Sequence, residues 1–311
     1  IFQVIQAIKQ GERVIAAVAP AFVGQFGPQM TVEKLRPAMK LLGFDNVAEV
    51  AVGADLCTIE EAKDFLREVP EHQPFMATSC CPAWSVMAKK LFPDFAPYIS
   101  MALTPMVLTA RLLKKEHPGC KVVFIGPCAA KTLTARLIKH KRPGSKVVFI
   151  GPCSAKKLEA SRRTIRSDVD FVLTFEEVMG MFEAKAINFA EIAGDEGLNE
   201  ATADGRGFAV SGGVAQAVVN VIKNLEPERE VKVMAAQGLR ECKKMLMLAK
   251  AGKLNGYLLE GMACPGGCVA GAGTLQNPVK STAGVNKYKA TAARKTSDES
   301  PYEITLNLLH D

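Results

Sequence analysis

Three short segments of this chain place cysteine next to proline or glycine, and their side chains have the greatest capacity for chemistry. Thiolates are soft ligands that bind zinc or iron–sulfur clusters, and glycine lets the backbone turn closely around such a group. One cysteine from each of the first two segments and two from the third would supply the four thiolates of a 4Fe-4S cluster. The segments are TSCCP at 78–82, GPCxAK at 126–131 and again at 151–156, and EGMACPGGC at 260–268.

The nine cysteines as a group favour metal binding over disulfide bonding. Their number is odd, and their spacing does not follow a disulfide framework. The sequence shows no signal-peptide pattern and no apolar run near the roughly 20 residues that span a bilayer. We therefore expect a cytoplasmic protein in a reducing compartment, with no membrane partner. We interpret Cys57 and Cys242 as small buried residues and Cys120 as incidental.

The positive charge of the chain is concentrated rather than spread. The net charge is +7, and Lys and Arg cluster between residues 114 and 146. Nucleic-acid binding surfaces interleave basic residues with aromatic ones, whereas only 6% of this chain is aromatic and it contains one Trp. We expect no nucleic-acid partner, because a solvated surface or an acidic protein partner fits this composition better.

Strand-like and helix-like segments alternate along the chain, which is typical of parallel α/β layers. In parallel sheets, ligands bind beyond the carboxyl ends of the strands. Each cysteine segment follows a predicted strand or precedes a predicted helix, which suits that geometry. Strands are predicted at 13–18, 121–125, 146–150, 170–174, 231–236 and 257–259, and helices at 31–42, 58–67, 103–115, 213–225 and 239–250.

Local signals predict where some of these helices start and stop. Capping boxes, in which a Thr precedes a Glu by three residues, predict helix starts at Thr58 and at Thr174. Pro37 would bend the 31–42 helix or mark its true start. The acidic residues 194–207, which include glycine, are predicted to form a loop.

The chain contains a tandem duplication of 25 residues. Residues 109–133 and 134–158 align without gaps and share 18 identities in 25 positions. Two copies are too few for a solenoid, which needs at least about three stacked units. We therefore expect one copy to occupy the native position in the fold and the other to be an insertion.

The three cysteine segments, in this order, resemble the catalytic domain of FeFe-hydrogenases, which holds the H-cluster. APA at 19–21, GADL at 53–56 and SGGV at 211–214 also match, so the resemblance covers essentially the whole chain. It implies an α/β fold of two parallel-sheet lobes flanked by helices, with the metal cluster in the cleft between them. We expect one H-cluster domain over 1–311, with approximate lobes at 1–118 and 119–259 and the last cluster-ligand loop within 260–311.

The resemblance implies a ligand set. In that family four cysteines hold a 4Fe-4S cubane, and the last also bridges to a two-iron subsite with CO, cyanide and a bridging dithiolate. The duplication leaves open whether Cys128 or Cys153 is a ligand. We favour Cys153, because Lys156 and Glu159 follow it as they do in the family. The implied ligands are Cys81, Cys153, Cys264 and the bridging Cys268.

The resemblance also implies roles around the two-iron subsite. Cys80 would pass protons to the bridgehead amine, and Lys156 would hydrogen-bond a cyanide. Linked carboxyl and hydroxyl groups can relay protons, and the implied route consists of Cys80, Glu159, Ser100, Glu61 and Asp64. The cofactor would also contact the backbone of Pro20 and Ala21, the side chain of Met262, and Gly151, which stands where the common enzymes have methionine.

Four departures resemble the sensory branch of the family: Gly151, Ala21 in place of a serine, Met106 in place of a glutamine, and GAGTLQ at 271–276 in place of a glycine run followed by Gln-Pro. We expect a hydrogenase that interconverts protons plus electrons and dihydrogen, with a second expectation of hydrogen sensing. The expected partners are a ferredoxin-like electron carrier, the hydrogenase maturases and a fused or associated sensory or ferredoxin domain. The alternatives are a cluster-assembly protein that holds only the cubane and a dihydrogen sensor in which catalysis is incidental.

Overall fold

Two parallel β-sheets form the framework of the protein, which confirms the expected α/β fold with two parallel-sheet lobes. The computed structural model describes residues 1–116, 121–125, 147–150, 153 and 171–309. The larger sheet has the strand order β2 (Asn46–Glu49), β1 (Val14–Val18), β4 (Lys121–Ile125), β5 (Val147–Ile150) and β6 (Phe171–Leu173). The smaller sheet has the order β3 (Phe75–Ala77), β8 (Tyr257–Met262) and β7 (Lys232–Gln237).

The strands do not follow the expected lobes at 1–118 and 119–259. The chain builds β1 and β2 of the larger sheet, crosses to β3 of the smaller sheet, and returns for β4, β5 and β6 before β7 and β8 complete the smaller sheet. Each sheet therefore takes strands from both sides of residue 118. Helix α3 (Val50–Glu68) carries the chain from β2 to β3, a span of roughly 28 Å at the rise of an α-helix.

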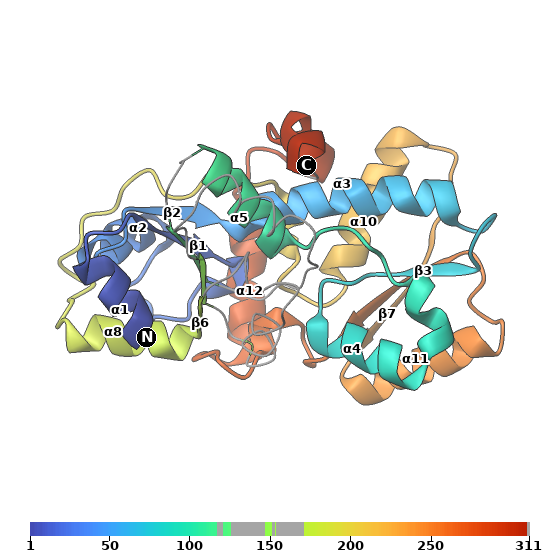
Figure 1. The fold of residues 1–311 in the computed structure, drawn as a ribbon, viewed down its shortest axis with the longest axis horizontal. Helices are drawn as coiled ribbons and strands as arrows, with labels where there is room; N and C mark the ends of the chain where they lie inside the picture. The colour runs from blue at the N-terminus through green and yellow to red at the C-terminus, as the bar shows by residue number, and fades with distance from the viewer. Residues whose placement is uncertain (117–120, 126–146, 151–152, 154–170, 310–311) are drawn as a thin grey trace.

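Helices flank both sheets, as crossover connections between parallel strands require. In Figure 1, α1, α2 and α8 lie beside the larger sheet, α4 and α11 beside the smaller one, and α12 between them. The helices are α1 (Phe2–Lys9), α2 (Val32–Leu42), α3, α4 (Pro82–Leu91), α5 (Pro105–Glu116), α8 (Phe175–Ala184), α9 (Ala203–Gly207), α10 (Gly213–Leu225), α11 (Leu239–Lys250) and α12 (Pro278–Ala290). Short 3-10 helices are η1 (Pro20–Phe22), η2 (Pro93–Tyr98), η3 (Cys268–Ala270), η4 (Ser297–Glu299) and η5 (Glu303–Leu309).

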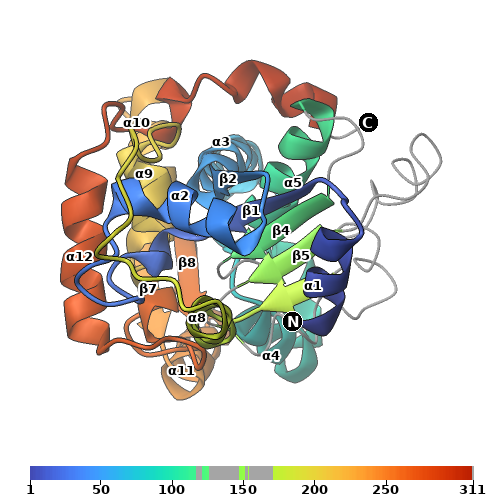
Figure 2. The same cartoon turned by 90° about the vertical axis from the view of Figure 1, so that its left-hand side faces the viewer.

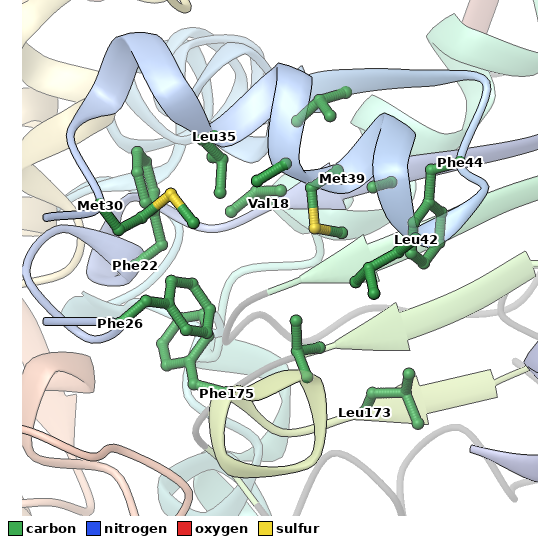
Figure 3. Close-up of a cluster of buried hydrophobic side chains, with 14 of the residues drawn as sticks. Val18, Phe22, Phe26, Met30, Leu35, Met39, Leu42, Phe44, Leu173 and Phe175 are labelled. Carbon is green, nitrogen blue, oxygen red and sulfur yellow. The ribbon is translucent and has the colours of Figure 1, made fainter. Parts of the chain in front are cut away.

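Each sheet has its own apolar core. Side chains from β1, α2 and α8 form the core of the larger lobe (Figure 3). Phe26 packs edge-on against Phe175 and Phe182, with ring centroids 5.9 and 5.5 Å away, and such pairs add about 0.5–1.5 kcal/mol beyond burial. Trp84 of α4 is fully buried in the core of the smaller lobe, to which α11 and β8 also contribute side chains.

Helix α3 starts well before its predicted position, so the Thr58–Glu61 capping box is wrong. Thr58 lies inside the helix, where its hydroxyl donates to the carbonyl oxygen of Ala54 at 2.9 Å. Threonine often makes this backward hydrogen bond within helices. The consequence is that Glu61 has no capping role. The second capping box is confirmed, because the Thr174 hydroxyl accepts from the Glu177 amide and the Glu177 carboxylate accepts from the Thr174 amide.

Other predicted elements agree with the structure except at a few places. Helix α2 runs from Val32 through Pro37, so the proline does not mark its start. Residues 203–207 of the expected acidic loop form α9. The sequence patterns missed α1, β2, β3, α4 and α12, of which β3 is only three residues long. Within the described ranges, no helix combines the length and apolar character needed to cross a membrane.

Both copies of the duplication contribute a strand to the larger sheet, as Figure 2 shows for β4 and β5 beside β1. The two strands pair in parallel with identical residues opposite each other, Val122 with Val147 through Ile125 with Ile150. The first copy, β4, pairs along β1, and the second, β5, pairs with β6. The extra copy therefore widens the sheet by one strand, because its strand sequence has the same capacity to pair.

Candidate metal centre and adjoining cavity

The smaller sheet brings the first and third cysteine segments together. Strands β3 and β8 are parallel neighbours, so their carboxyl ends lie at the same edge. The Thr78 amide extends this pairing by donating to the carbonyl oxygen of Leu259 at 2.9 Å. Cys80 and Cys81 leave this edge from β3, and Cys264 leaves it just after β8.

The first residues of the EGMACPGGC segment hold the edge in place. The Glu260 carboxylate is fully buried and accepts from the amides of Gly212 and Ala215 at 2.6 and 2.8 Å, at the start of α10. Burial raises the pKa of Glu260, and these amides lower it in part. A Cβ on Gly261 would overlap the indole of Trp84, so only glycine fits there.

Trp84 stabilises the loop at this edge of the smaller sheet. Its indole N–H donates to the carbonyl oxygen of Thr78 at 3.0 Å, which fixes the loop that carries Cys80 and Cys81. The glycines at 266 and 267 adopt positive φ angles of 99° and 92°, which side chains disfavour. A Cβ on Gly267 would also crowd the amide of Ser211. The loop around the third segment is thus tight and closely packed.

Three of the four expected ligand thiols lie near one another. Burial raises the pKa of the Cys264 thiol to about 11, and the nearby thiols of Cys153 and Cys81 raise it further. The amide of Ala263 donates to the sulfur of Cys81 at 3.3 Å, a contact that stabilises a thiolate. Cys268, the fourth, lies in η3, and all four side chains are partly exposed.

The donor set fits an iron–sulfur cluster. It consists of soft sulfur ligands carried on a tight glycine turn, with a backbone amide that donates to one sulfur. Among the described residues, no group of three His, Cys, Asp or Glu side chains is placed to bind a single metal ion. Whether Cys153 rather than Cys128 is the ligand stays a prediction, since Cys128 lies outside the described residues.

A partly open cavity adjoins the metal centre at Cys268. Four of its lining residues were singled out from the sequence: Pro20, Cys80, Met262 and Cys268. They come from η1, the loop after β3, the end of β8 and η3, so residues far apart in the sequence meet here. Ala21 is fully buried next to Pro20 but does not line the cavity. The remaining lining residues are Val50, Ala54, Pro105, Gly205, Phe208 and Ala209.

Most residues of this second set carry no motif that could be recognised from sequence. Val50, Ala54 and Pro105 belong to α3 and α5, and apolar residues in helices read as ordinary core. Gly205 lies in a segment predicted to be a loop. The GADL motif at 53–56 pointed to this region, but its resemblance alone did not indicate what the motif contacts.

The structure describes Cys80, Ser100, Glu61 and Asp64 of the expected proton route. Glu61 on α3 is 0% exposed, and burial raises the pKa of its carboxyl to about 8. Ser100 and the Ser79 amide face this carboxyl and lower its pKa in part, but neither reaches full hydrogen-bond geometry. Asp64, one turn further along α3, accepts from Arg67 at 2.6 Å and is partly exposed. Ser79 directly precedes Cys80, so Glu61 lies close to the loop that carries this thiol.

Three expected site residues, Gly151, Lys156 and Glu159, lie outside the described residues, and their roles stay predictions. Cys57 and Cys242 are fully buried, as interpreted. The Cys242 thiol donates to the carbonyl oxygens of Ala236 and Met262 at 3.4 and 3.6 Å, so it packs behind the metal centre.

Comparison with known proteins yields one family match. The chain matches the iron only hydrogenase large subunit, C-terminal domain, over residues 12–136 and 132–272. The two matched ranges meet inside the duplicated 109–158 region, as expected if the duplication interrupts a single domain.

Its relatives include both hydrogenases and iron–sulfur cluster assembly factors. Iron hydrogenase 1 of Clostridium pasteurianum is 27% identical over 312 residues, which cover 84% of this chain and 50% of that protein. A probable cytosolic Fe-S cluster assembly factor of Aedes aegypti is 28% identical over 336 residues, covering 91% of this chain and 61% of that protein. This chain thus spans about half the length of the clostridial hydrogenase.

Solved structures show the same fold. A variant of [FeFe]-hydrogenase HydA1 from Chlamydomonas reinhardtii superposes with a TM-score of 0.70 at 23% identity, over 97% of this chain and 93% of that chain. The likeness therefore extends over nearly all of both chains.

Proposed function

This chain belongs to the family of the iron only hydrogenase large subunit, C-terminal domain, and we propose that it is a hydrogenase that interconverts dihydrogen with protons and electrons. The observation that carries the proposal is the position of Cys80. This thiol lines a cavity together with Pro20, Met262 and Cys268. A protein that held only a 4Fe-4S cubane would have no use for a thiol that faces an adjoining cavity.

The residues divide the work as follows. Cys81, Cys153, Cys264 and Cys268 would hold the cubane, and Cys268 would also join it to a two-iron subsite in the cavity. The two-iron subsite, when bound, supplies the metal at which dihydrogen is made or cleaved. The walls contributed by Val50, Ala54 and Phe208 are apolar and would exclude bulk water from it.

Cys80 would exchange protons between this cavity and the interior of the protein. Its thiol is 7% exposed, so direct exchange with solvent is restricted. Glu61 suits the next position of a proton relay, because its pKa of about 8 lets it both accept and donate near neutral pH. Ser100 lies against Glu61, and Asp64 continues toward the surface.

We further propose that electrons arrive from a ferredoxin-like carrier beside the third cysteine segment. Pro265 is exposed and packs against Gly238, so the ligand loop reaches the surface at the start of α11. The exposed side of α11 carries four basic residues around the exposed Met247, namely Arg240, Lys243, Lys244 and Lys250, and one acid, Glu241, which pairs with Arg240 and Lys244. An acidic carrier fits this charge.

The carrier proposal is tested by charge reversal. In the Lys243→Glu, Lys244→Glu double variant, turnover with an acidic ferredoxin should fall about tenfold, while turnover with a small viologen dye stays unchanged. The matched control is Lys280→Glu with Lys287→Glu on α12, where both side chains are also exposed. Equal losses in both double variants would contradict docking at α11.

The second candidate is a cluster-assembly protein, favoured by the relatives of that group. Such a protein would bind the cubane alone. Met106 is buried near the cavity, and its apolar side chain would suit an interior that holds no second cofactor. A hydrogen-sensing hydrogenase with low turnover is a variation of the leading proposal, and the departures at Ala21 and Met106 support it.

One experiment separates the candidates. The protein is co-produced with hydrogenase maturases, and infrared spectra are recorded for bound CO and cyanide. Bands in the wild type support the hydrogenase, and their absence from a protein that carries four irons favours the assembly class. The Cys80→Ala variant should keep these bands and its iron content but lose at least about 100-fold in turnover. Full turnover in this variant would contradict the proton route.

A further inference from the structure

Helix α9 forms one wall of the cavity, yet it is too short to hold its own position. Gly205 and the following Phe208 and Ala209 line the cavity, and all five residues of α9 are buried. A helix of five residues makes few internal hydrogen bonds and does not persist without external contacts. The position of this wall must therefore depend on side chains from other elements.

The first of these side chains is Asp55, the acid of the GADL motif. Its carboxyl on α3 is 0% exposed and accepts from the amide and the hydroxyl of Thr202 at 3.0 and 2.5 Å. It also accepts from the Ser297 hydroxyl at 3.0 Å. Thr202 is the N-cap of α9, and its hydroxyl accepts from the Gly205 amide at 3.2 Å. Asp55 is thus linked by hydrogen bonds to the cavity-lining Gly205 through a single residue, Thr202.

Two further buried groups hold the same helix. Arg206 donates to the two oxygens of Glu49 at 3.0 and 2.9 Å, and its guanidinium lies 3.9 Å from the ring centre of Tyr288. The Asp204 carboxylate accepts from the side-chain amide of Asn220 at 2.9 and 3.1 Å. The helix is consequently held on several sides.

Helices α9 and α3 are closely packed, with no space for a larger side chain between them. A Cβ on Gly205 would overlap both the carbonyl oxygen of Ala51 and the carboxyl of Asp55. Ala54, the neighbour of Asp55, lines the cavity from the α3 side. The two helices therefore meet backbone to backbone at the edge of the cavity, and Asp55 sits at this junction.

Burying a carboxyl group is costly unless it is hydrogen-bonded, and a carboxyl whose hydrogen bonds are all made fixes the positions of the groups that it joins. We propose that Asp55 is a positioning residue that fixes the wall of residues 203–209 and so sets the room for a small exogenous ligand in the cavity. The nature of that ligand, dihydrogen or CO, rests on the proposed function; the positioning of the wall does not.

The experiment compares Asp55→Ala and Asp55→Asn with Gln25→Ala. The asparagine keeps an acceptor for the Thr202 amide and can donate to the two hydroxyls. Gln25 is a matched control: it is 2% exposed, hydrogen-bonds Ser281 and the amides of Leu275 and Gln276, and does not line the cavity. Amide hydrogen exchange is measured on the protein without cofactor, and infrared spectra on the matured protein with CO added.

In Asp55→Ala, amides 203–209 should exchange roughly tenfold faster than in the wild type, and the CO bands of the matured protein should shift or broaden. Asp55→Asn should restore slow exchange, and Gln25→Ala should leave these amides unchanged. Wild-type exchange at 203–209 in Asp55→Ala, or the same acceleration in Gln25→Ala, would overturn the proposal. If the wild type binds no CO or cyanide, the proposed function fails, and the exchange data still decide the positioning role.

Discussion

Two buried carboxyl groups on the same helix, Asp55 and Glu61, have opposite surroundings. Both are 0% exposed, and burial raises the pKa of Asp55 to about 7 and that of Glu61 to about 8. Asp55 accepts three hydrogen bonds from residues on other elements. The oxygens of Glu61 have no hydrogen bond of full geometry in the described structure. Asp55 is anchored by its partners, whereas Glu61 has no hydrogen bond of full geometry among the described residues to anchor it.

The difference shows how one helix can serve structure and chemistry at once. A buried acid with a complete set of partners defines a geometry, because any movement breaks several hydrogen bonds. A buried acid with an incomplete set of hydrogen bonds is stabilised when it binds a water molecule or transfers its proton to a neighbouring group. On α3, the first kind lies where the helix contacts α9 and the second where it faces the loop before Cys80.

The largest expected effect comes from removing the proton of Glu61. Glu61→Gln keeps the shape of the side chain but cannot exchange a proton, so turnover should fall by about 100-fold or more. Iron content and CO bands should match the wild type, since no cluster ligand is changed. The measurement is dihydrogen evolution with a viologen donor. Turnover near the wild-type value would mean that protons do not pass through Glu61.

A smaller effect is expected from removing Asp55. Asp55→Ala leaves the Thr202 amide and the Ser297 hydroxyl without an acceptor, which costs about 1–3 kcal/mol of unfolding free energy. Denaturant unfolding of the protein without cofactor measures this loss. Glu61→Gln serves as the comparison, and we expect it to lose less stability. A reversed order would contradict the distinction between an anchored and an unanchored acid.

The pH dependence of stability sharpens the contrast further. The pKa of Glu61 is about 8 in the folded protein against an ordinary 4.5, so the folded state holds the proton between these values. Its contribution to stability is full below about pH 4.5 and is lost as the pH rises through about 8. The unfolding temperature of the wild type should fall as the pH rises from about 4.5 to about 8, and Glu61→Gln should reduce that slope, leaving the part that Asp55 contributes. An unchanged slope would rule out Glu61 as its source.

The smallest effect is expected for Asp55→Asn. Asp55, with a folded pKa of about 7, is largely protonated in mildly acidic solution, and an amide resembles the protonated acid. At pH 6 the variant should differ from the wild type by less than about 1 kcal/mol in unfolding free energy. A loss as large as that of Asp55→Ala would show that the charge of Asp55, rather than its hydrogen bonds, holds α9.

The sequence predicted most of the regular structure, and its errors have identifiable causes. Predictions held for α10 and α11, whose apolar periodicity is long and clear. The start of α3 was missed because the Thr58–Glu61 spacing imitates a capping box inside a longer, mostly buried helix. Strand β3 was missed because three residues carry too little pattern. The same limit applies to α9, which exists through its contacts with α3.

The sequence by itself determined the donor chemistry of this protein and its alternation of strands and helices. Cysteine type, the spacing of Cys264 and Cys268, and the glycines between them are local properties that can be read directly. Only the tertiary structure decided that Cys81 lies near Cys264, that Cys80 faces a cavity with Pro20 and that Glu61 is buried. These facts depend on which strands pair and which helices touch, and such contacts join residues far apart in the chain.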